Sequence, residues 1–376
     1  MVRHSQFLVP DNQPRQSENG GYGYLMIETL RISNFRCYSN LRLSGLKRLN
    51  IIVGANSSGK TTLLESLFMV AGASAANAAF QLRALRQLGS TLQVLSDPMS
   101  YQGLWEDLFH WFKLDQIISI EASGSSSDSR SLLVYYDNSS NQLLPFGSES
   151  IPSTFFPQIN FEWKRGDENP VIVKPKISSK GLEFEGASTE YFPVILFGPH
   201  ASNTPDENAR RFSALSRDGK ADSVIRALKG EFSFLESLSI EYASSIPSVF
   251  ATVRGTNKKL PVGLLSDGIN KLLSILLGIA SFSRGTVLID QIEDGFYFDR
   301  LQSIWEIIHS FAVLHNVQVF ATTHSRECLE SLLPTVKNHT SDFCLLRAKR
   351  EKDSCSVSQF DGDGLLAALQ KRGEIR

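Results

Sequence analysis

Short apolar runs, each followed by a turn or a helical pattern, recur at both ends of the chain. Three of them cover residues 49–53, 286–289 and 317–322, and a fourth, 272–280, reads as a buried helix that is too short to span a bilayer. Unbroken apolar runs are typical of parallel strands buried on both faces, whereas half-exposed strands alternate. The two ends of the chain therefore predict an α/β fold with a central sheet.

The intervening chain alternates apolar and polar residues, as antiparallel strands do. We expect an alternating strand at 25–32, a second near 41–43, and several short strands in 116–163, where Ser, Gly and Asn supply the turns. With a further strand at 193–197, they predict an antiparallel β lobe at about 116–197.

Helical insertions are expected after the lobe. A polar, basic segment leads into an amphipathic helix at 222–228, and we interpret about 201–235 as a helical arm with a solvated positive face. Alternating strands at 238–242 and 249–253 are expected to return the chain to the sheet. The prediction is thus a single α/β domain, 25–376, with a mixed central sheet, an antiparallel β lobe and helical insertions.

Composition narrows the function only slightly. The chain has 376 residues, with 38 Lys and Arg against 39 Asp and Glu, so its bulk charge gives no sign of a nucleic-acid or membrane partner. Its four cysteines lack metal-ligand spacing, which suits a reducing compartment. Residues 1–24 are polar, without the apolar core of a signal peptide, and we expect a disordered tail on a cytoplasmic protein.

A glycine-rich segment joins the first apolar strand to a helix and fits the phosphate-loop pattern G-x-x-x-x-G-K-[ST]. Its residues are Gly54, Ala55, Asn56, Ser57, Ser58, Gly59, Lys60, Thr61 and Thr62. Glycines let backbone N–H groups surround phosphates, and the helix N-terminus adds partial positive charge. Lys60 would reach the β- and γ-phosphates of ATP, and Thr61 would bind Mg²⁺. The plain alternative, a Gly/Ser turn, is disfavoured by the Lys-Thr pair.

Two polar residues follow apolar strands further along the chain. Asp290 ends the run 286–289, so we expect it to be the Mg²⁺ partner of Thr61, although any core strand can end in a turn aspartate. His324 comes shortly after the run 317–322 and can hydrogen-bond a γ-phosphate or a positioned water, while a lone histidine is more often structural.

Ser266, Asp267 and Gly268 open the long apolar helix. A hydroxyl, free N–H groups and the helix dipole together favour an anion, so this segment predicts a second phosphate site. A plain helix cap at Ser266 is the competing interpretation.

The order of these motifs resembles the ATPase heads of the ABC type, in the branch of RecF, the structural-maintenance-of-chromosomes (SMC) proteins and the overcoming-lysogenization-defect (OLD) ATPases. The likeness rests on 32–36, the phosphate loop, the signature 265–268, the Asp290 strand and 321–325. It is strongest to small bacterial AAA-family, OLD-like ATPases without a fused TOPRIM nuclease, and it spans nearly everything after residue 25.

The resemblance implies a head-to-tail homodimer with two ATP molecules and Mg²⁺ at its interface. Each ATP would lie between the phosphate loop of one subunit and the signature residues 266–268 of the other. By the same resemblance, Asn34 and Arg36 contact nucleotide phosphates and His324 is a switch histidine.

The acidic strand departs from this family pattern. Relatives carry Asp-Glu-Ile-Glu, where the first Glu polarises the attacking water, but this chain has Gln291 after Asp290, followed by Ile292 and Glu293. An amide cannot accept a proton, and losing a general base costs about 10²–10⁴-fold in rate. We predict slow ATP hydrolysis, whether Gln291 is natural or an engineered replacement. Glu293 would substitute as the base only if the chain stays extended.

The resemblance leaves two functions open. The first is an ATP-driven switch in a bacterial anti-phage defence system, acting with a separate TOPRIM-type nuclease or other effector. The second is a RecF-like DNA repair clamp, which needs a basic surface for duplex DNA. Its candidate residues are Arg83, Arg86, Arg210, Arg211, Arg254, Lys258 and Lys259. The neutral net charge ranks the clamp below the switch, and the 34–36 motif argues against a transporter ATPase.

Overall fold

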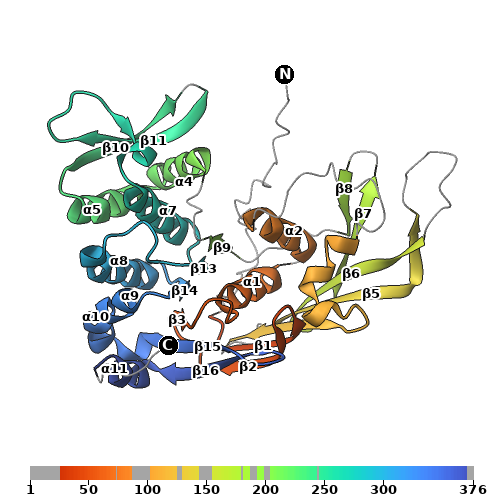
Figure 1. Cartoon of the computed structure of the whole chain (residues 1–376). Helices are drawn as coiled ribbons and strands as arrows, with labels where there is room; N and C mark the ends of the chain where they lie inside the picture. Colours follow the sequence, from red (N-terminus) through yellow and green to blue (C-terminus); the bar gives the residue numbers. More distant parts are fainter. Residues whose placement is uncertain are drawn as a thin grey trace.

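The computed structural model describes residues 26–72, 74–86, 102–124, 129–143, 155–178, 181–186, 193–198, 204–243 and 245–370. The tail expected at 1–24 lies outside these residues. Figure 1 shows a central helix, α1, with β-sheets on two sides of it and a layer of helices on the far side of one sheet.

A six-stranded sheet carries the apolar runs of both ends of the chain. Its order is β16-β15-β3-β14-β13-β9, and all neighbours run parallel except β15 and β16. The strands are β3 (Leu49–Val53), β9 (Val194–Phe197), β13 (Thr286–Ile289), β14 (Gln318–Thr322), β15 (Phe343–Arg350) and β16 (Cys355–Asp361). The carboxyl ends of β3 and β13, which are more than two hundred residues apart in the sequence, therefore lie on the same side of this sheet.

Successive residues of these strands point to opposite faces, which divides the core in two. Leu49, Ile51 and Val53 belong to one hydrophobic cluster, which the helical layer covers, whereas Ile52 belongs to the cluster around α1. Burial on both faces is why the runs are apolar without alternation.

The second sheet is antiparallel and has seven strands, in the order β2-β1-β4-β5-β6-β7-β8. They are β1 (Thr29–Phe35), β2 (Tyr38–Ser44), β4 (Ile118–Ser123), β5 (Ser129–Leu143), β6 (Phe155–Arg165), β7 (Val171–Ser178) and β8 (Gly181–Glu185). Their inward side chains meet Leu63, Leu64 and Leu67 of α1 (Lys60–Val70). The mixed α/β fold with an antiparallel lobe is thus confirmed.

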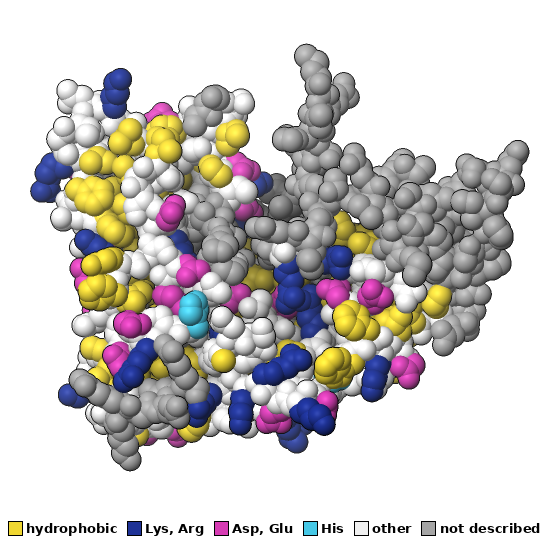
Figure 2. All heavy atoms as spheres, viewed as in Figure 1, with side chains coloured by type: hydrophobic (Ala, Val, Ile, Leu, Met, Phe, Trp, Pro, Cys, Tyr) yellow, Lys and Arg dark blue, Asp and Glu magenta, His cyan; other side chains and the backbone are white. Residues whose placement is uncertain are grey.

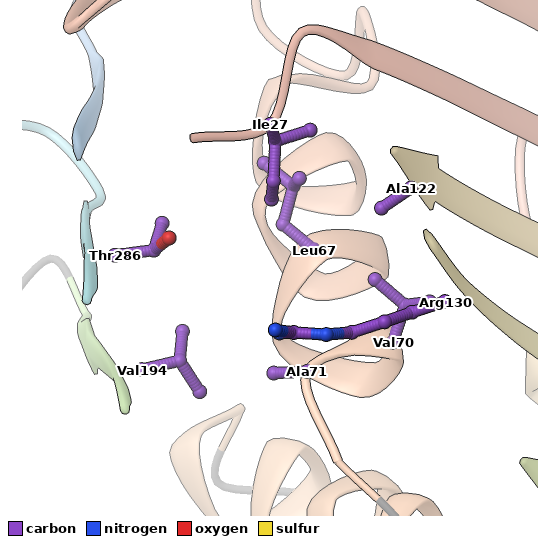
Figure 3. A pocket seen from close by; sticks show the side chains of 8 residues that line it. All are labelled: Ile27, Leu67, Val70, Ala71, Ala122, Arg130, Val194 and Thr286. Carbon is purple, nitrogen blue, oxygen red and sulfur yellow. The ribbon is translucent and has the colours of Figure 1, made fainter. Parts of the chain in front are cut away.

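A small cavity marks the place where α1 meets both sheets. It is lined by Leu67 and Ala71 at the end of α1, by Val194 and Thr286 from the parallel sheet, and by Arg130 from β5, whose side chain extends across the last turns of α1 (Figure 3). Its volume of about 10 Å³ admits no more than a water molecule. We conclude that the seam is closely packed.

Two boundaries predicted from the sequence were wrong. β9 does not belong to the antiparallel lobe, which ends at β8, because it pairs in parallel with β13. The strands β10 (Leu235–Ala243) and β11 (Ile246–Val253) do not return to the central sheet but form a separate antiparallel sheet with β12 (Leu260–Pro261). Alternation identifies β10 and β11 as half-exposed strands but does not identify their neighbours. The run Val194–Phe197 does not alternate, and its unbroken apolar character is that of a parallel strand.

The predicted arm is a packed layer. Phe212 and Leu215 of α4 (Pro205–Arg217) and Val224 and Leu228 of α5 (Ala221–Glu231) join the same core as α7 (Asp267–Ser281). The other helices are α2 (Ala75–Leu85), η2 (Glu106–Leu108), η3 (His110–Phe112), α6 (Val262–Leu265), η4 (Phe298–Arg300), α8 (Leu301–Leu314), α9 (Arg326–Ser331), α10 (Leu333–Asn338), η5 (Thr340–Asp342) and α11 (Gly362–Gln370). Within the described ranges, none of the helices has the length and apolar character needed to cross a bilayer.

Candidate functional site

The phosphate loop connects β3 to α1 in a conformation that requires glycine. Gly54 and Gly59 have φ of 146° and 98°, in the left-handed region. A Cβ on Gly54 would lie 2.2 Å from the Ala348 carbonyl oxygen, and one on Gly59 would lie 2.7 Å from the Tyr38 hydroxyl. The loop is therefore held tightly between β15 and β2 and leads directly into the N-terminus of α1.

Lys60 folds back over this loop. Its Nζ donates to the carbonyl oxygens of Gly54 and Ala55, at 2.8 and 2.9 Å. Burial lowers the pKa of Lys60, and the carboxylates of Asp290 and Glu293 oppose that shift. The Ser58 hydroxyl is buried and has no hydrogen-bond partner in the described part of the chain. A buried cation beside an unpaired hydroxyl at a helix N-terminus suits an anionic ligand.

Thr61 and Asp290 meet at the edge of the parallel sheet. The Thr61 hydroxyl donates to one carboxylate oxygen of Asp290 at 2.7 Å, and the Thr322 hydroxyl donates to the other at 2.5 Å. They meet because β14, which carries Thr322, lies between β3 and β13. Thr322 was missed in the sequence, although a threonine that ends a wholly buried strand was an available signal.

The residues after Asp290 turn sharply. Gln291 has φ of 52°, so the backbone is not extended and Glu293 does not share its strand face. Instead, Oε1 of Glu293 accepts from the backbone N–H groups of His324 and Ser325, at 3.0 and 3.2 Å, and lies 3.1 Å from Nδ1 of His324. The condition under which Glu293 would replace the usual base is not met, and its carboxylate instead holds the segment around His324.

The signature segment caps α7. The Ser266 hydroxyl accepts from the Gly268 N–H at 3.2 Å, as a helix cap does. A Cβ on Gly268 would lie 2.5 Å from the Gly295 carbonyl oxygen, so the segment packs against the turn after the acidic strand. In the described residues, 266–268 make no hydrogen bond or ion pair with the phosphate loop of the same chain.

Lys271 ties α7 to the acidic strand, and the sequence reasoning missed it. Its buried ammonium donates to the Gln291 carbonyl oxygen at 2.7 Å and lies over the Phe296 ring. Burial lowers the pKa of Lys271, while the Asp294 carboxylate opposes that shift. A lysine directly before the apolar run 272–280 of this helix was the signal for such a contact.

Asn34 and Arg36 both already have side-chain partners. Arg36 forms a buried ion pair with Glu65 of α1 at 3.0 Å and a longer one with Asp107 at 3.7 Å. The Asn34 amide donates to the Ile117 carbonyl oxygen at 3.0 Å, at the rim of an open groove of about 570 Å³ that Trp111 also lines. Phosphate contact by Arg36 requires the pair with Glu65 to loosen, so this role stays a prediction.

An antiparallel sheet on one side of α1 and a parallel sheet with a helical layer on the other surround the phosphate loop, as in an ABC-type ATPase head. The chain is an ATP-hydrolysing enzyme of that class. It belongs to the family described as "AAA domain, putative AbiEii toxin, Type IV TA system", which residues 49–330 match.

Similar proteins include an "ATP/GTP phosphatase" of Helicobacter pylori, 24% identical over 353 residues, or 85% of this chain and 92% of that protein. The DNA replication and repair protein RecF of Idiomarina loihiensis is 48% identical, but over only 46 residues, which are 12% of this chain and 13% of RecF. Among solved structures, an SMC head bound to the C-terminal winged-helix domain of ScpA is similar with a TM-score of 0.47, at 12% identity, over 89% of this chain and 98% of that chain.

Proposed function

We propose that this chain is an ATP-dependent dimerising switch that hydrolyses ATP slowly. The observation that carries the proposal is the 2.7 Å hydrogen bond between the Thr61 hydroxyl and the Asp290 carboxylate. It joins the end of the phosphate loop to the acidic strand across 229 residues of sequence. Such a pair is the donor set that P-loop enzymes use beside the nucleotide.

The residues of the loop suit a triphosphate with Mg²⁺. Lys60 would exchange its two carbonyl contacts for phosphate oxygens, and the first N–H groups of α1 would donate to them. Thr61 and Asp290 would hold Mg²⁺, which neutralises phosphate charge. These oxygens are hard ligands of the kind that Mg²⁺ prefers.

Slow ATP hydrolysis is proposed because of the two residues, Gln291 and Glu293, that follow Asp290. Gln291 can orient a water but cannot accept its proton. Oε1 of Glu293 accepts from two backbone N–H groups, and these bonds hold the carboxylate against the segment around His324 and not on the strand face of Gln291. The chain would therefore remain ATP-bound for longer than a relative with Glu at this position.

Dimerisation is proposed because, among the described residues, the signature segment 266–268 makes no hydrogen bond with the phosphate loop of its own chain. Leu264 and the turn residues Tyr297 and Phe298 are exposed large apolar side chains, at 79%, 65% and 61%. The contact between Gly268 and Gly295 brings these two segments together on one surface. Exposed apolar residues beside a helix start suit a surface that another subunit covers.

An anti-phage role with a separate effector is the biological role that we favour, and the description of the family as "putative AbiEii toxin" supports it. The alternative DNA clamp gains less support. Five of its seven candidate basic residues, Arg83, Arg86, Arg210, Arg211 and Lys259, already form ion pairs. Along the lower edge of the face in Figure 2, some Asp and Glu side chains lie among the Lys and Arg side chains.

The test combines nucleotide binding with light scattering. We expect the full chain to bind ATP with Mg²⁺ and to shift from monomer to dimer, and we expect ADP to leave it monomeric. Asp290→Asn should weaken the Mg²⁺-dependent part of ATP binding. A chain that binds ATP equally well with and without Mg²⁺, or stays monomeric when saturated with ATP, would contradict the proposal.

A further inference from the structure

Three metal-ligating side chains gather at the end of the molecule where α8 and α10 lie together (Figure 1). They are His309 on α8, His339 directly after α10, and Asp342 at the end of η5. One ligand atom from each residue lies within 4.8 Å of those of the other two. None of the three belongs to the ATP site described above.

The group is held from several sides. Nε2 of His309 lies 2.9 Å from a carboxylate oxygen of Asp342, and the His309 side chain is only 7% exposed. The His339 ring stacks on His309 with centroids 4.3 Å apart, and Phe343 lies 5.7 Å from His309. His339 is exposed, so the group is fixed on one side and open to solvent on the other.

A plain structural pair explains His309 and Asp342 but not His339. The stack is not itself a coordination geometry, because imidazole lone pairs lie in the ring planes and two nearly parallel rings do not point at one ion. His339 is exposed and can turn out of the stack, and a divalent cation would then accept one nitrogen from each ring and one carboxylate oxygen. Two imidazoles and a carboxylate are a common donor set for Zn²⁺, which leaves a fourth position for water.

We propose that His309, His339 and Asp342 form a site for Zn²⁺ or a similar divalent transition metal. The ligands come from α8 and from the connection between α10 and β15, so the bound ion fastens these segments together. β15 pairs with β3, the strand that carries the phosphate loop. Metal binding to the folded state alone would therefore stabilise the sheet beneath the ATP site.

The experiment measures metal binding by the nucleotide-free full chain in excess Mg²⁺, which competes with Zn²⁺ for the proposed Thr61–Asp290 site. We expect one Zn²⁺ per chain, visible tetrahedral absorption when Co²⁺ replaces it, and a higher Tm with Zn²⁺. His339→Ala, chosen because this side chain is exposed, should weaken Zn²⁺ binding by at least about tenfold and abolish the Tm shift. His315→Asn, which changes a histidine at the end of the same helix, should bind Zn²⁺ as the unaltered chain does.

Two results would overturn the site. One is an unaltered chain that binds no Zn²⁺ and gives no tetrahedral Co²⁺ absorption. The other is His339→Ala with the same Zn²⁺ affinity and Tm shift as the unaltered chain. Asp342→Asn supplies a second variant, and it should also weaken Zn²⁺ binding while leaving ATP affinity unchanged.

Discussion

The N-termini of α1 and α7 are both suited to phosphate, but their surroundings differ. At α1, Lys60 is buried and Thr61 is bonded to Asp290, so the chain itself provides the polar groups around the helix start. At α7, Ser266 bonds to its own helix and to no other described element, and the neighbouring Leu264 is 79% exposed. The comparison suggests that the first site binds ATP unaided, while the second acts only against another surface.

The largest change is expected at the residue that follows Asp290. Gln291→Glu restores a proton acceptor, so ATP turnover should rise by about 10²–10⁴-fold. Steady-state phosphate release under saturating ATP measures this directly. Gln291→Asn keeps an amide and should leave the rate low. Equal rates for Gln291→Glu and the unaltered chain would mean that position 291 does not limit hydrolysis.

Lys60→Ala tests the ATP site at the N-terminus of α1, where the chain itself provides the polar groups. Loss of a charged hydrogen-bond donor costs roughly 1.5–3 kcal/mol, so ATP affinity should fall by about 10–10²-fold. Calorimetric titration with ATP gives this value. Lys258→Ala removes an exposed lysine of the same charge and serves as the control. An unchanged ATP affinity in Lys60→Ala would contradict the proposal that the phosphate loop binds ATP.

Ser266→Arg tests whether the N-terminus of α7 acts in dimerisation while the N-terminus of α1 binds ATP. A bulky cation at the proposed interface should weaken ATP-induced dimerisation by about tenfold or more, while the ATP affinity of the monomer stays within about twofold. Ser283→Arg, at the other end of α7, carries the same substitution on an exposed residue. Light scattering and ATP titration together distinguish the outcomes, and parallel losses of both quantities would show that the two sites are not separate.

The smallest effect is expected from packing beneath the signature. Gly268→Ala forces a Cβ to within 2.5 Å of the Gly295 carbonyl oxygen and should lower the free energy of unfolding by about 1–3 kcal/mol. Gly263→Ala is the matched control, because no atom lies within 4 Å of its added Cβ. Urea unfolding measures both. Equal stability of the two variants would mean that the turn moves freely.

The fold class and much of the candidate site could be predicted from the sequence. The unbroken apolar runs gave the parallel strands, and the loop and Asp290 motifs lay at strand ends that a parallel sheet brings to one edge. The separate sheet of β10 and β11 could not be predicted, because alternation carries no information about neighbours. The parallel pairing of β9 could have been predicted, because its unbroken apolar run is buried on both faces, as in the other parallel strands. The ion pair of Arg36 with Glu65 could not be predicted from the sequence either, because it depends on how β1 packs on α1.

The most direct test of the central claim mixes two inactive variants in the Gln291→Glu background. One carries Lys60→Ala and the other carries Ser266→Arg, so a mixed dimer has one complete site, made of the second variant's phosphate loop and the first variant's signature. If each site is shared between two subunits, an equal mixture should recover about a quarter of full turnover, because half of the dimers are mixed and each has one of its two sites intact. Turnover no higher than that of the separate variants would contradict a shared site.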